Sequence, residues 1–247
     1  MLTSQFSLAS DNEQPQNLNI AVASNFLTTL QQLKPLFERQ YTKQGIQLKL
    51  ISASTGQLSH QIMNGAPFDV FLSANKQHPH TLQKALKQPS AYLRPYALGQ
   101  LVLIHQPEVN CQGRTIKECL TSEQVKKIAI ANKKLAPYGL ASEQVLQSLE
   151  LDKTLKSKLI TGQNISQSFQ FFSTGNTQLA FVAASQVFQN DRIAQMQIKV
   201  IDKSLYEPIE QWALRLNDKA ASQLFLDFLS TETACQVMLQ NGYGCGP

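Results

Sequence analysis

The first third of the chain alternates between two hydrophobic periods, and this alternation constrains the fold more than any other feature. Apolar residues first alternate with small or polar ones, as in a strand: Leu18, Ile20 and Val22. Beyond the pair Ser24 and Asn25 they recur at the spacing of a helix face: Leu27, Leu30, Leu33 and Phe37. We expect a strand that leads into a helix capped at its N-terminus, with a kink or a break at Pro35 and a stop at Gly45.

The same strand, turn and helix pattern then repeats. Ile46, Leu48 and Leu50 alternate, the polar run 52–56 forms a turn, and a helical pattern follows as far as Gly65. Residues 69–73 are typical of a short buried strand. The order is therefore β-α-β-α-β, which predicts a parallel sheet with helices on its faces, because parallel strands need a crossover connection.

Strand and helix patterns keep alternating to the end of the chain, which predicts an α/β fold. Further strands are predicted over residues 100–105, 127–131, 159–161, 179–183, 198–201 and 212–216. Further helices are predicted over residues 141–151, 166–172, 185–188 and 220–239. The last helix should be in two pieces, because Ser230, Thr231 and Glu232 resemble a new N-terminal cap.

The composition is that of a globular protein with a modest basic excess. Of 247 residues, 43% are hydrophobic and 16% charged, so a core can form, and the length allows two medium lobes or one large domain. The charge of +5 could help to steer a small anion. Basic pairs are isolated, without the clustered arginines and interleaved aromatic residues of a nucleic-acid surface, so we expect no nucleic-acid partner.

The four cysteines form two local pairs, Cys111 with Cys119 and Cys235 with Cys245. Neither pair has the spacing of a zinc knuckle or a redox motif. Three pairings are possible, and proximity in sequence favours the two local disulfides, which would place the protein in an oxidising compartment. The alternative is four buried free thiols.

The N-terminal residues lack the features of an intact signal peptide. No Lys or Arg precedes Lys34, and no long apolar run follows Met1. The small residues of segment 6–10 resemble a cleavage region, and segment 11–16 resembles a polar mature tail. We therefore expect an exported, soluble protein whose signal peptide is absent or truncated in this chain; no stretch has the ~20 apolar residues of a membrane span.

Two turns in the first third are suited to binding an anion. The pairs Ser24-Asn25 and Ser54-Thr55 each follow a strand and precede a helix, so free N–H groups and the positive end of a helix dipole face the turn. In a parallel sheet both turns lie at the carboxyl ends of strands, where such folds bind ligands. The alternative is that these residues are ordinary N-terminal caps.

No pattern in the sequence supports catalysis. Ser54 lacks the glycine-flanked elbow of a nucleophilic serine, and the histidines have no acid or cysteine beside them that would suggest a triad. His78 and His80 could bind a metal ion, but Pro79 lies between them and no acidic residue is near, which favours a solvated loop. Phosphate-binding and dinucleotide-binding glycine motifs are absent.

Several segments, in chain order, resemble the periplasmic molybdate-binding protein family of ABC importers. They are Ala23-Ser24-Asn25-Phe26, Ser54-Thr55-Gly56-Gln57-Leu58, residues 65–74 with the sequence GAPFDVFLSA, residues 136–141 with the sequence APYGLA, and residues 162–167 with the sequence GQNISQ. The match runs from about residue 18 to the C-terminus, and the Gly-Ala-Pro-x-Asp segment is its most specific part.

The resemblance implies a type II periplasmic-binding fold, in which two α/β lobes joined by a hinge enclose the ligand. Lobe 1 would contain residues 16–96 and 205–247, and lobe 2 residues 97–204, with both cysteine pairs outside the cleft. The implied ligand is molybdate or tungstate, so molybdenum would enter only as the oxyanion and no cofactor is needed. The implied partner is a membrane ABC permease, and the protein should be a monomer without enzymatic activity.

Carried over position by position, the resemblance implies a set of oxyanion donors: Ser24, Asn25, Thr55, Tyr138 and, through its backbone N–H, Ile165, with Ser54 as a further candidate. Some members of the family instead supply a tyrosine from the strand position of Ala183, so this chain resembles the branch that uses position 138. The alternatives are a protein that binds sulfate, thiosulfate or another small anion, and a ligand-sensing regulatory domain.

Overall fold

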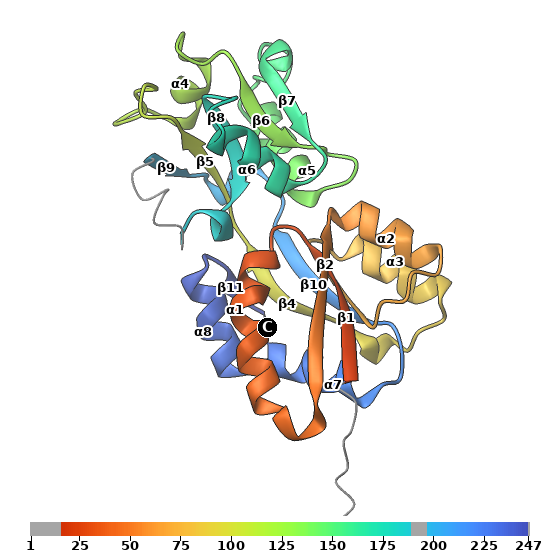
Figure 1. The fold of residues 1–247 in the computed structure, drawn as a ribbon. Coiled ribbons are helices and arrows are strands. Elements are labelled where there is room, and N and C mark those ends of the chain that lie inside the picture. The colour runs from red at the N-terminus through yellow and green to blue at the C-terminus, as the bar shows by residue number, and fades with distance from the viewer. Residues whose placement is uncertain (1–15, 189–196, 247) are drawn as a thin grey trace, which may run out of the picture.

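The computed structural model describes residues 16–188 and 197–246 and has two lobes, each built on its own β-sheet (Figure 1). Lobe 1 contains a six-stranded sheet in the order β11-β4-β10-β3-β1-β2. Its strands are β1 (Gln16–Ala23), β2 (Ile46–Ala53), β3 (Val70–Ser73), β4 (Leu93–Gly99), β10 (Ile209–Arg215) and β11 (Gly244–Cys245). Its helices are α1 (Leu27–Gln40), α2 (Thr55–Met63), α3 (Gln77–Ala85), α7 (Ala220–Leu229) and α8 (Glu232–Gln240).

Lobe 2 contains a five-stranded sheet in the order β7-β6-β8-β5-β9. Its strands are β5 (Leu101–His105), β6 (Ile128–Ala131), β7 (Leu159–Gly162), β8 (Leu179–Ala183) and β9 (Gln197–Val200). Its helices are α4 (Ile116–Thr121), α5 (Pro137–Ser148) and α6 (Ile165–Ser173), and short 3₁₀ turns include Ala184–Gln186. The chain passes between the two sheets twice, from β4 to β5 and from β9 back to β10 (Figure 1).

The predicted parallel β-α-β-α-β unit is confirmed. Strand β1 pairs in parallel with both β2 and β3, and the β1–β2 register runs from Gln16 opposite Ile46 to Ala23 opposite Ala53. Lobe 2 repeats the arrangement, because β6 pairs in parallel with β7 and Ala131 lies opposite Gly162. Each lobe therefore carries two adjacent parallel strands that end at the same level.

Apolar side chains fill both lobes and the junction between them. The core of lobe 1 packs α1, α7 and α8 on one face of the sheet, with Phe37 in edge-on contact with Phe225 and Phe228. A second cluster contains lobe 2 residues together with Ala23 and Ala74 of lobe 1, so it crosses the junction. The strand ends that carry the polar turns are therefore set in a dry, packed region.

The structure corrects the expected break in the first helix. Helix α1 is uninterrupted from Leu27 to Gln40 with Pro35 inside it. Proline has no N–H, so the carbonyl of Gln31, one turn earlier, has no helical partner. Pro35 and Gln31 are both exposed, so water can bond to this carbonyl. The helix ends before Gly45, which instead closes a following 3₁₀ turn with φ of +59°.

Several elements are absent from the sequence prediction or wrongly assigned by it. Strand β4 was not predicted; it contains Pro95, which lies next to a bulge at Tyr96 of the same strand, where a missing N–H is tolerated. The loop predicted around His78 and His80 is the start of helix α3, since Pro79 lies in its first turn, where no helical bond is lost. Helix α4 was missed although Thr115 and Glu118 form a capping box before it.

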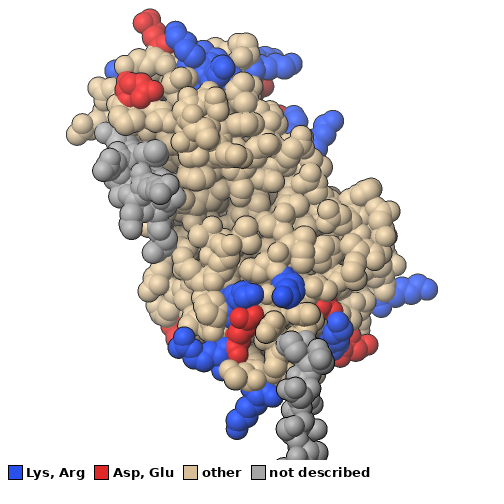
Figure 2. All heavy atoms as spheres, viewed as in Figure 1, with Lys and Arg blue, Asp and Glu red and all other residues tan. Residues whose placement is uncertain are grey.

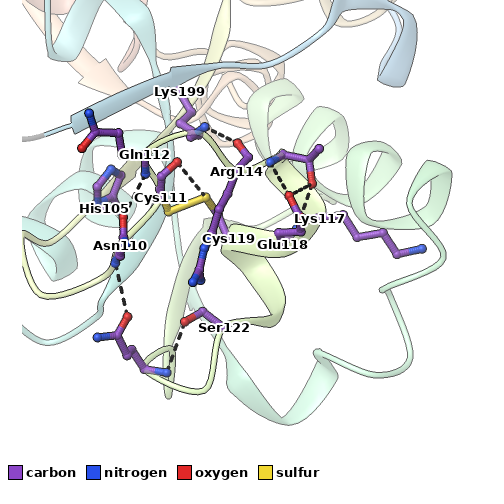
Figure 3. Close-up of a disulfide and its surroundings, with 12 residues drawn as sticks. His105, Asn110, Cys111, Gln112, Arg114, Lys117, Glu118, Cys119, Ser122 and Lys199 are labelled. Atoms are coloured by element: carbon purple, nitrogen blue, oxygen red, sulfur yellow. Dashed lines mark hydrogen bonds between the residues drawn. A yellow bond between two sulfur atoms is a disulfide. The ribbon is translucent and has the colours of Figure 1, made fainter.

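Both predicted disulfides are present, and the described part of the chain has no free cysteine. The Cys111–Cys119 bond closes the loop between β5 and α4, with Cα atoms 5.3 Å apart (Figure 3). The Cys235–Cys245 bond ties α8 to β11, with Cα atoms 5.4 Å apart. The predicted break at Thr231 is also confirmed, because the Thr231 hydroxyl caps α8.

Candidate functional site

Four strand-to-helix turns face one another where the lobes meet, and they carry the predicted site residues. In lobe 1, Ser24 and Asn25 follow β1, and Ser54 and Thr55 follow β2. In lobe 2, Tyr138 is the second residue of α5, which follows β6, and Ile165 is the first residue of α6, which follows β7. All four turns thus lie at the carboxyl ends of parallel strands, as predicted for the first two.

Hydrogen bonds between the lobes bring the four turns together. The Gly56 N–H in the second turn donates to the Leu135 carbonyl, 2.9 Å away, just before α5. The Ser166 hydroxyl in the fourth turn donates to the Ser24 carbonyl in the first, at 3.3 Å. A Cβ built on Gly56 would lie 3.2 Å from the Leu135 backbone, so the absence of a side chain permits this close approach.

Each of the four turns offers a backbone N–H that has no acceptor among the described residues. These groups belong to Asn25, Thr55, Tyr138 and Ile165. The last three are in the first turns of helices, where N–H groups have no intrahelical partner. All four residues are at most 2% exposed. Buried N–H groups are almost always paired in proteins, so this cluster indicates a site for an acceptor.

The serine and threonine hydroxyls in the two lobe 1 turns have different roles. Ser54 forms a capping box at the start of α2: its hydroxyl donates to Gln57 Oε1 at 2.8 Å and accepts the Gln57 N–H at 3.4 Å. The alternative assignment as a helix cap therefore applies to Ser54. The Thr55 hydroxyl accepts the Ala74 N–H at 3.1 Å and keeps its own hydrogen for another acceptor. The hydroxyl of Ser24, a residue that is 7% exposed, bonds to no described residue.

Tyr138 brings an unpaired hydroxyl from lobe 2 into the junction. The side chain is 1% exposed, and its Oη has no hydrogen-bond partner among the described residues. Burial raises the pKa of the phenol well above its ordinary value, and the neighbouring Tyr243 raises it further, so the group stays protonated and can donate. Gly99 makes room for it, because a Cβ there would lie 2.2 Å from the Tyr138 Oη.

The Asn25 side chain does not cap helix α1, so the alternative that Asn25 is an ordinary N-terminal cap is wrong. The cap position is Phe26, and α1 has no side-chain cap. Asn25 Nδ2 instead donates to Gln211 Oε1 at 2.8 Å and to Tyr243 Oη at 2.9 Å, which uses both amide hydrogens. The backbone N–H is therefore the donor that Asn25 leaves free.

Three residues beside the site were not predicted: Gln211, Tyr243 and Ser185. They lie 186, 218 and 160 positions from Asn25, and all are buried. No local pattern marks them, because each meets Asn25 only through the folding of distant segments. The sequence marks two of them only indirectly. Gln211 is a polar residue within an apolar strand, and Tyr243 lies inside the segment closed by Cys235 and Cys245.

The site contains dipoles and no charged side chains. Asp69 is the one buried Asp, Glu, Lys or Arg in the described part of the chain; it bonds to Lys219 and precedes β3, at the opposite end of that strand from the turns. Groups of three or more His, Cys, Asp or Glu that could hold a metal ion are also absent from residues 16–188 and 197–246. In Figure 2 charged side chains gather toward the two ends, and the junction is mostly uncharged in this view.

A groove of about 430 Å³ lies between the lobes next to the second and third turns. Lobe 1 lines it with α2 and α3, including His78, and lobe 2 with the segment that leads into α5, including Lys133 and Lys134. Lys133 forms an ion pair with Glu143. The groove lies at one side of the junction between the lobes, and its charged lining residues are basic.

Comparisons with known proteins agree with this geometry. The family model for bacterial extracellular solute-binding proteins matches residues 18–244. The molybdate-binding protein ModA of Azotobacter vinelandii is 37% identical over 94% of this chain and 91% of its own length, and ModA of Rhodobacter capsulatus is 36% identical over 90% and 86%.

The solved structure of the periplasmic molybdate-binding protein of Azotobacter vinelandii matches with a TM-score of 0.84 and 31% identity, over 93% of this chain and all of that one. None of the described helices is long and apolar enough to cross a membrane. The predicted family and two-lobed α/β fold are thereby confirmed. The chain belongs to the bacterial extracellular solute-binding protein family and, within it, to the molybdate-binding proteins.

Proposed function

We propose that this protein captures molybdate, or the closely similar tungstate, between its two lobes in the periplasm and delivers it to a membrane ABC permease. The observation that carries the proposal is the cluster of four unpaired, buried N–H groups at Asn25, Thr55, Tyr138 and Ile165, drawn from both lobes. Relatives that match over most of the chain are named as molybdate-binding proteins, which supports the choice of ligand.

The donors are the four backbone N–H groups together with the hydroxyls of Ser24, Thr55 and Tyr138. A tetrahedral dianion offers four oxygens as acceptors, and it would complete the hydrogen bonding of groups that otherwise lack a partner. Bonds from neutral donors to a charged acceptor contribute about 1.5–3 kcal/mol each. Helix N-termini add the favourable end of their dipoles, so no buried counter-ion is needed. Ser54 acts through its cap on α2, which orients the Thr55 N–H.

Selectivity follows from the kind and spacing of the donors. Backbone N–H groups can only donate, and no buried carboxylate of the described residues lies at the turns to accept a ligand proton, which disfavours protonated phosphate. Sulfate has the same charge and shape as molybdate but shorter bonds from its central atom to oxygen, so donors placed for the larger anion would reach it less well. Sulfate or thiosulfate binding remains the second candidate, because the donor chemistry is the same.

The protein acts as a monomer and catalyses no reaction in this proposal. The two lobes move about the β4–β5 and β9–β10 connections. The oxyanion is the cargo and not a resident cofactor. A sensor of the same fold would use the same cleft, so the distinction from a transport protein rests on the named relatives.

Titration calorimetry with molybdate, tungstate, sulfate and phosphate tests the proposal. We expect tight binding of one molybdate or tungstate per chain and much weaker binding of sulfate and phosphate. Preferential binding of sulfate would support the second candidate, and the absence of binding to all four anions would refute oxyanion capture.

A further inference from the structure

A buried network of hydroxyl and amide groups joins the lobes beside the first turn. Ser185 Oγ and Tyr243 Oη both donate to the backbone carbonyl of Asn25, at 2.7 and 2.8 Å. Ser185 belongs to lobe 2, in the 3₁₀ turn Ala184–Gln186 after β8, whereas Tyr243 belongs to the C-terminal segment of lobe 1. One carbonyl of a ligand-binding turn is therefore held from both lobes at once.

The directions of the bonds in this network are tightly determined. Gln211 Nε2 donates to the Ile209 carbonyl at 3.0 Å, so the Gln211 Oε1 is presented to the Asn25 amide. The second Asn25 amide hydrogen goes to Tyr243 Oη, and the Tyr243 hydrogen goes to the Asn25 carbonyl. Asn25, Ser185, Gln211 and Tyr243 are at most 4% exposed, so water cannot replace a lost partner at low cost.

Tyr243 is anchored independently of this network. It lies within the segment that the Cys235–Cys245 disulfide closes, and its N–H donates to the Met238 carbonyl at 3.0 Å. Its ring packs edge-on against Phe26, with centroids 5.3 Å apart. The disulfide sulfurs are outside the network, but the segment they close reaches into the junction between the lobes.

The same segment touches lobe 2 directly. Gly242 has a φ of +74°, and a Cβ there would lie 2.7 Å from the Phe188 ring and 2.9 Å from the Ala184 Cβ. Ser185 Oγ also lies 3.1 Å from Tyr243 Oη. Ser185 therefore contacts both Asn25 and Tyr243 across the junction between the lobes.

We propose that Tyr243 and Ser185 are positioning residues that form a latch between the lobes, so that closure of the cleft and orientation of the Asn25 turn are coupled. This inference rests on the proposed oxyanion function and assigns a role to two residues that need not touch the ligand. The latch stabilises the closed form, in which all four N–H groups face one site, and it slows the release of the anion.

The test compares Tyr243→Phe, Ser185→Ala and the double variant with the parent protein. The matched control is Tyr96→Phe, because Tyr96 packs on the same Phe26 ring and its buried hydroxyl has no partner among the described residues. Molybdate affinity is measured by calorimetry, and its dissociation rate by displacing radiolabelled molybdate with excess unlabelled anion. Thermal unfolding without ligand reports stability separately.

We expect each single variant to bind molybdate about tenfold more weakly, mainly through faster dissociation, while the control matches the parent. The losses should not add in the double variant, because the two hydroxyls share one acceptor. Additive losses would overturn the coupling. If both single variants bind and release molybdate like the parent, the latch is refuted. If Tyr243→Phe fails to fold, the affinity and dissociation rate of Ser185→Ala decide whether the latch exists. If the parent binds no molybdate, it is the proposed function that fails.

Discussion

Replacing Tyr138 with phenylalanine removes one buried hydroxyl and leaves the ring that packs in the core. That hydroxyl has no partner among the described residues. Leaving a buried polar group unpaired costs about 1–3 kcal/mol, so Tyr138→Phe should leave the free energy of unfolding unchanged or raise it. In a protein of this size, 1 kcal/mol corresponds to about 2–4 °C in melting temperature. The ligand-free variant is therefore expected to melt at the parent's temperature or a few degrees higher.

Binding should change in the opposite direction. A hydrogen bond to a charged acceptor is worth about 1.5–3 kcal/mol, and its loss corresponds to a roughly 10- to 150-fold weaker affinity for molybdate. Opposite signs for stability and affinity separate a ligand donor from a residue that only supports the fold. The assay is calorimetry for affinity with differential scanning calorimetry for melting.

Tyr96→Phe is the control for this substitution as well. It removes another buried hydroxyl without a partner among the described residues, and burial likewise raises its pKa well above the ordinary value. It should match Tyr138→Phe in stability and the parent in affinity. If Tyr138→Phe binds molybdate as tightly as the parent, the phenol is not a donor; if it binds weakly and also melts lower, the loss reflects damage to the fold.

The same geometry makes predictions for Gly99, for Asn25 and for the effects of pH. Gly99→Ala should weaken molybdate binding about as much as Tyr138→Phe, because a Cβ at position 99 would lie 2.2 Å from the Tyr138 Oη. The variant that carries both substitutions should bind no more weakly than either single variant, and additive losses measured by calorimetry would contradict this. Asn25→Ala should lower the free energy of unfolding in urea by about 1–3 kcal/mol, because Gln211 Oε1 loses its donor; unchanged stability would count against the network. Affinity should be constant from about pH 6 to 9, since burial raises the phenol pKa of Tyr138 and raises that of Tyr243 to about 12, and a titration within that range would reveal an unrecognised ionisable group.

Alkaline pH should reduce stability. The ordinary phenol pKa is 10.0, and burial raises the pKa of Tyr243 to about 12 in the folded protein. The unfolded chain therefore loses this proton first, and the stabilisation that is fully present below pH 10 disappears as the pH rises to about 12. Two pKa units correspond to about 2–3 kcal/mol. Urea titrations of the parent and Tyr243→Phe check this, and an equally steep alkaline loss in both would assign the effect to other groups.

Local sequence patterns were sufficient for the elements that place the lobe 1 turns. The strands β1 and β2 have clean alternation, and each ends in polar residues before a helix, so the positions of Ser24 and Thr55 at parallel strand ends were predictable. Tyr138 and Ile165 followed from the resemblance to a family, because a tyrosine near the start of a helix has no distinctive pattern of its own. Both disulfides followed from short sequence separation.

The remaining features depend on contacts between distant segments. Capping by Ser54 and the absence of capping by Asn25 could not be distinguished in sequence, since both residues precede helices. Asn25 meets Gln211 and Tyr243 only because β10 and the C-terminal segment return to lobe 1. Strand β4 was hidden by Pro95, whose cost is offset by a bulge beside it in the same strand.

The central claim is that N–H groups from four turns enclose one oxyanion between the lobes. A crystal structure of the protein with molybdate, phased on the anomalous scattering of molybdenum, tests it most directly. We predict one strong anomalous peak in the cleft, with molybdate oxygens about 2.7–3.2 Å from the backbone nitrogens of Asn25, Thr55, Tyr138 and Ile165. A peak held by surface lysines, or a cleft without molybdenum in crystals of saturated protein, would contradict the account.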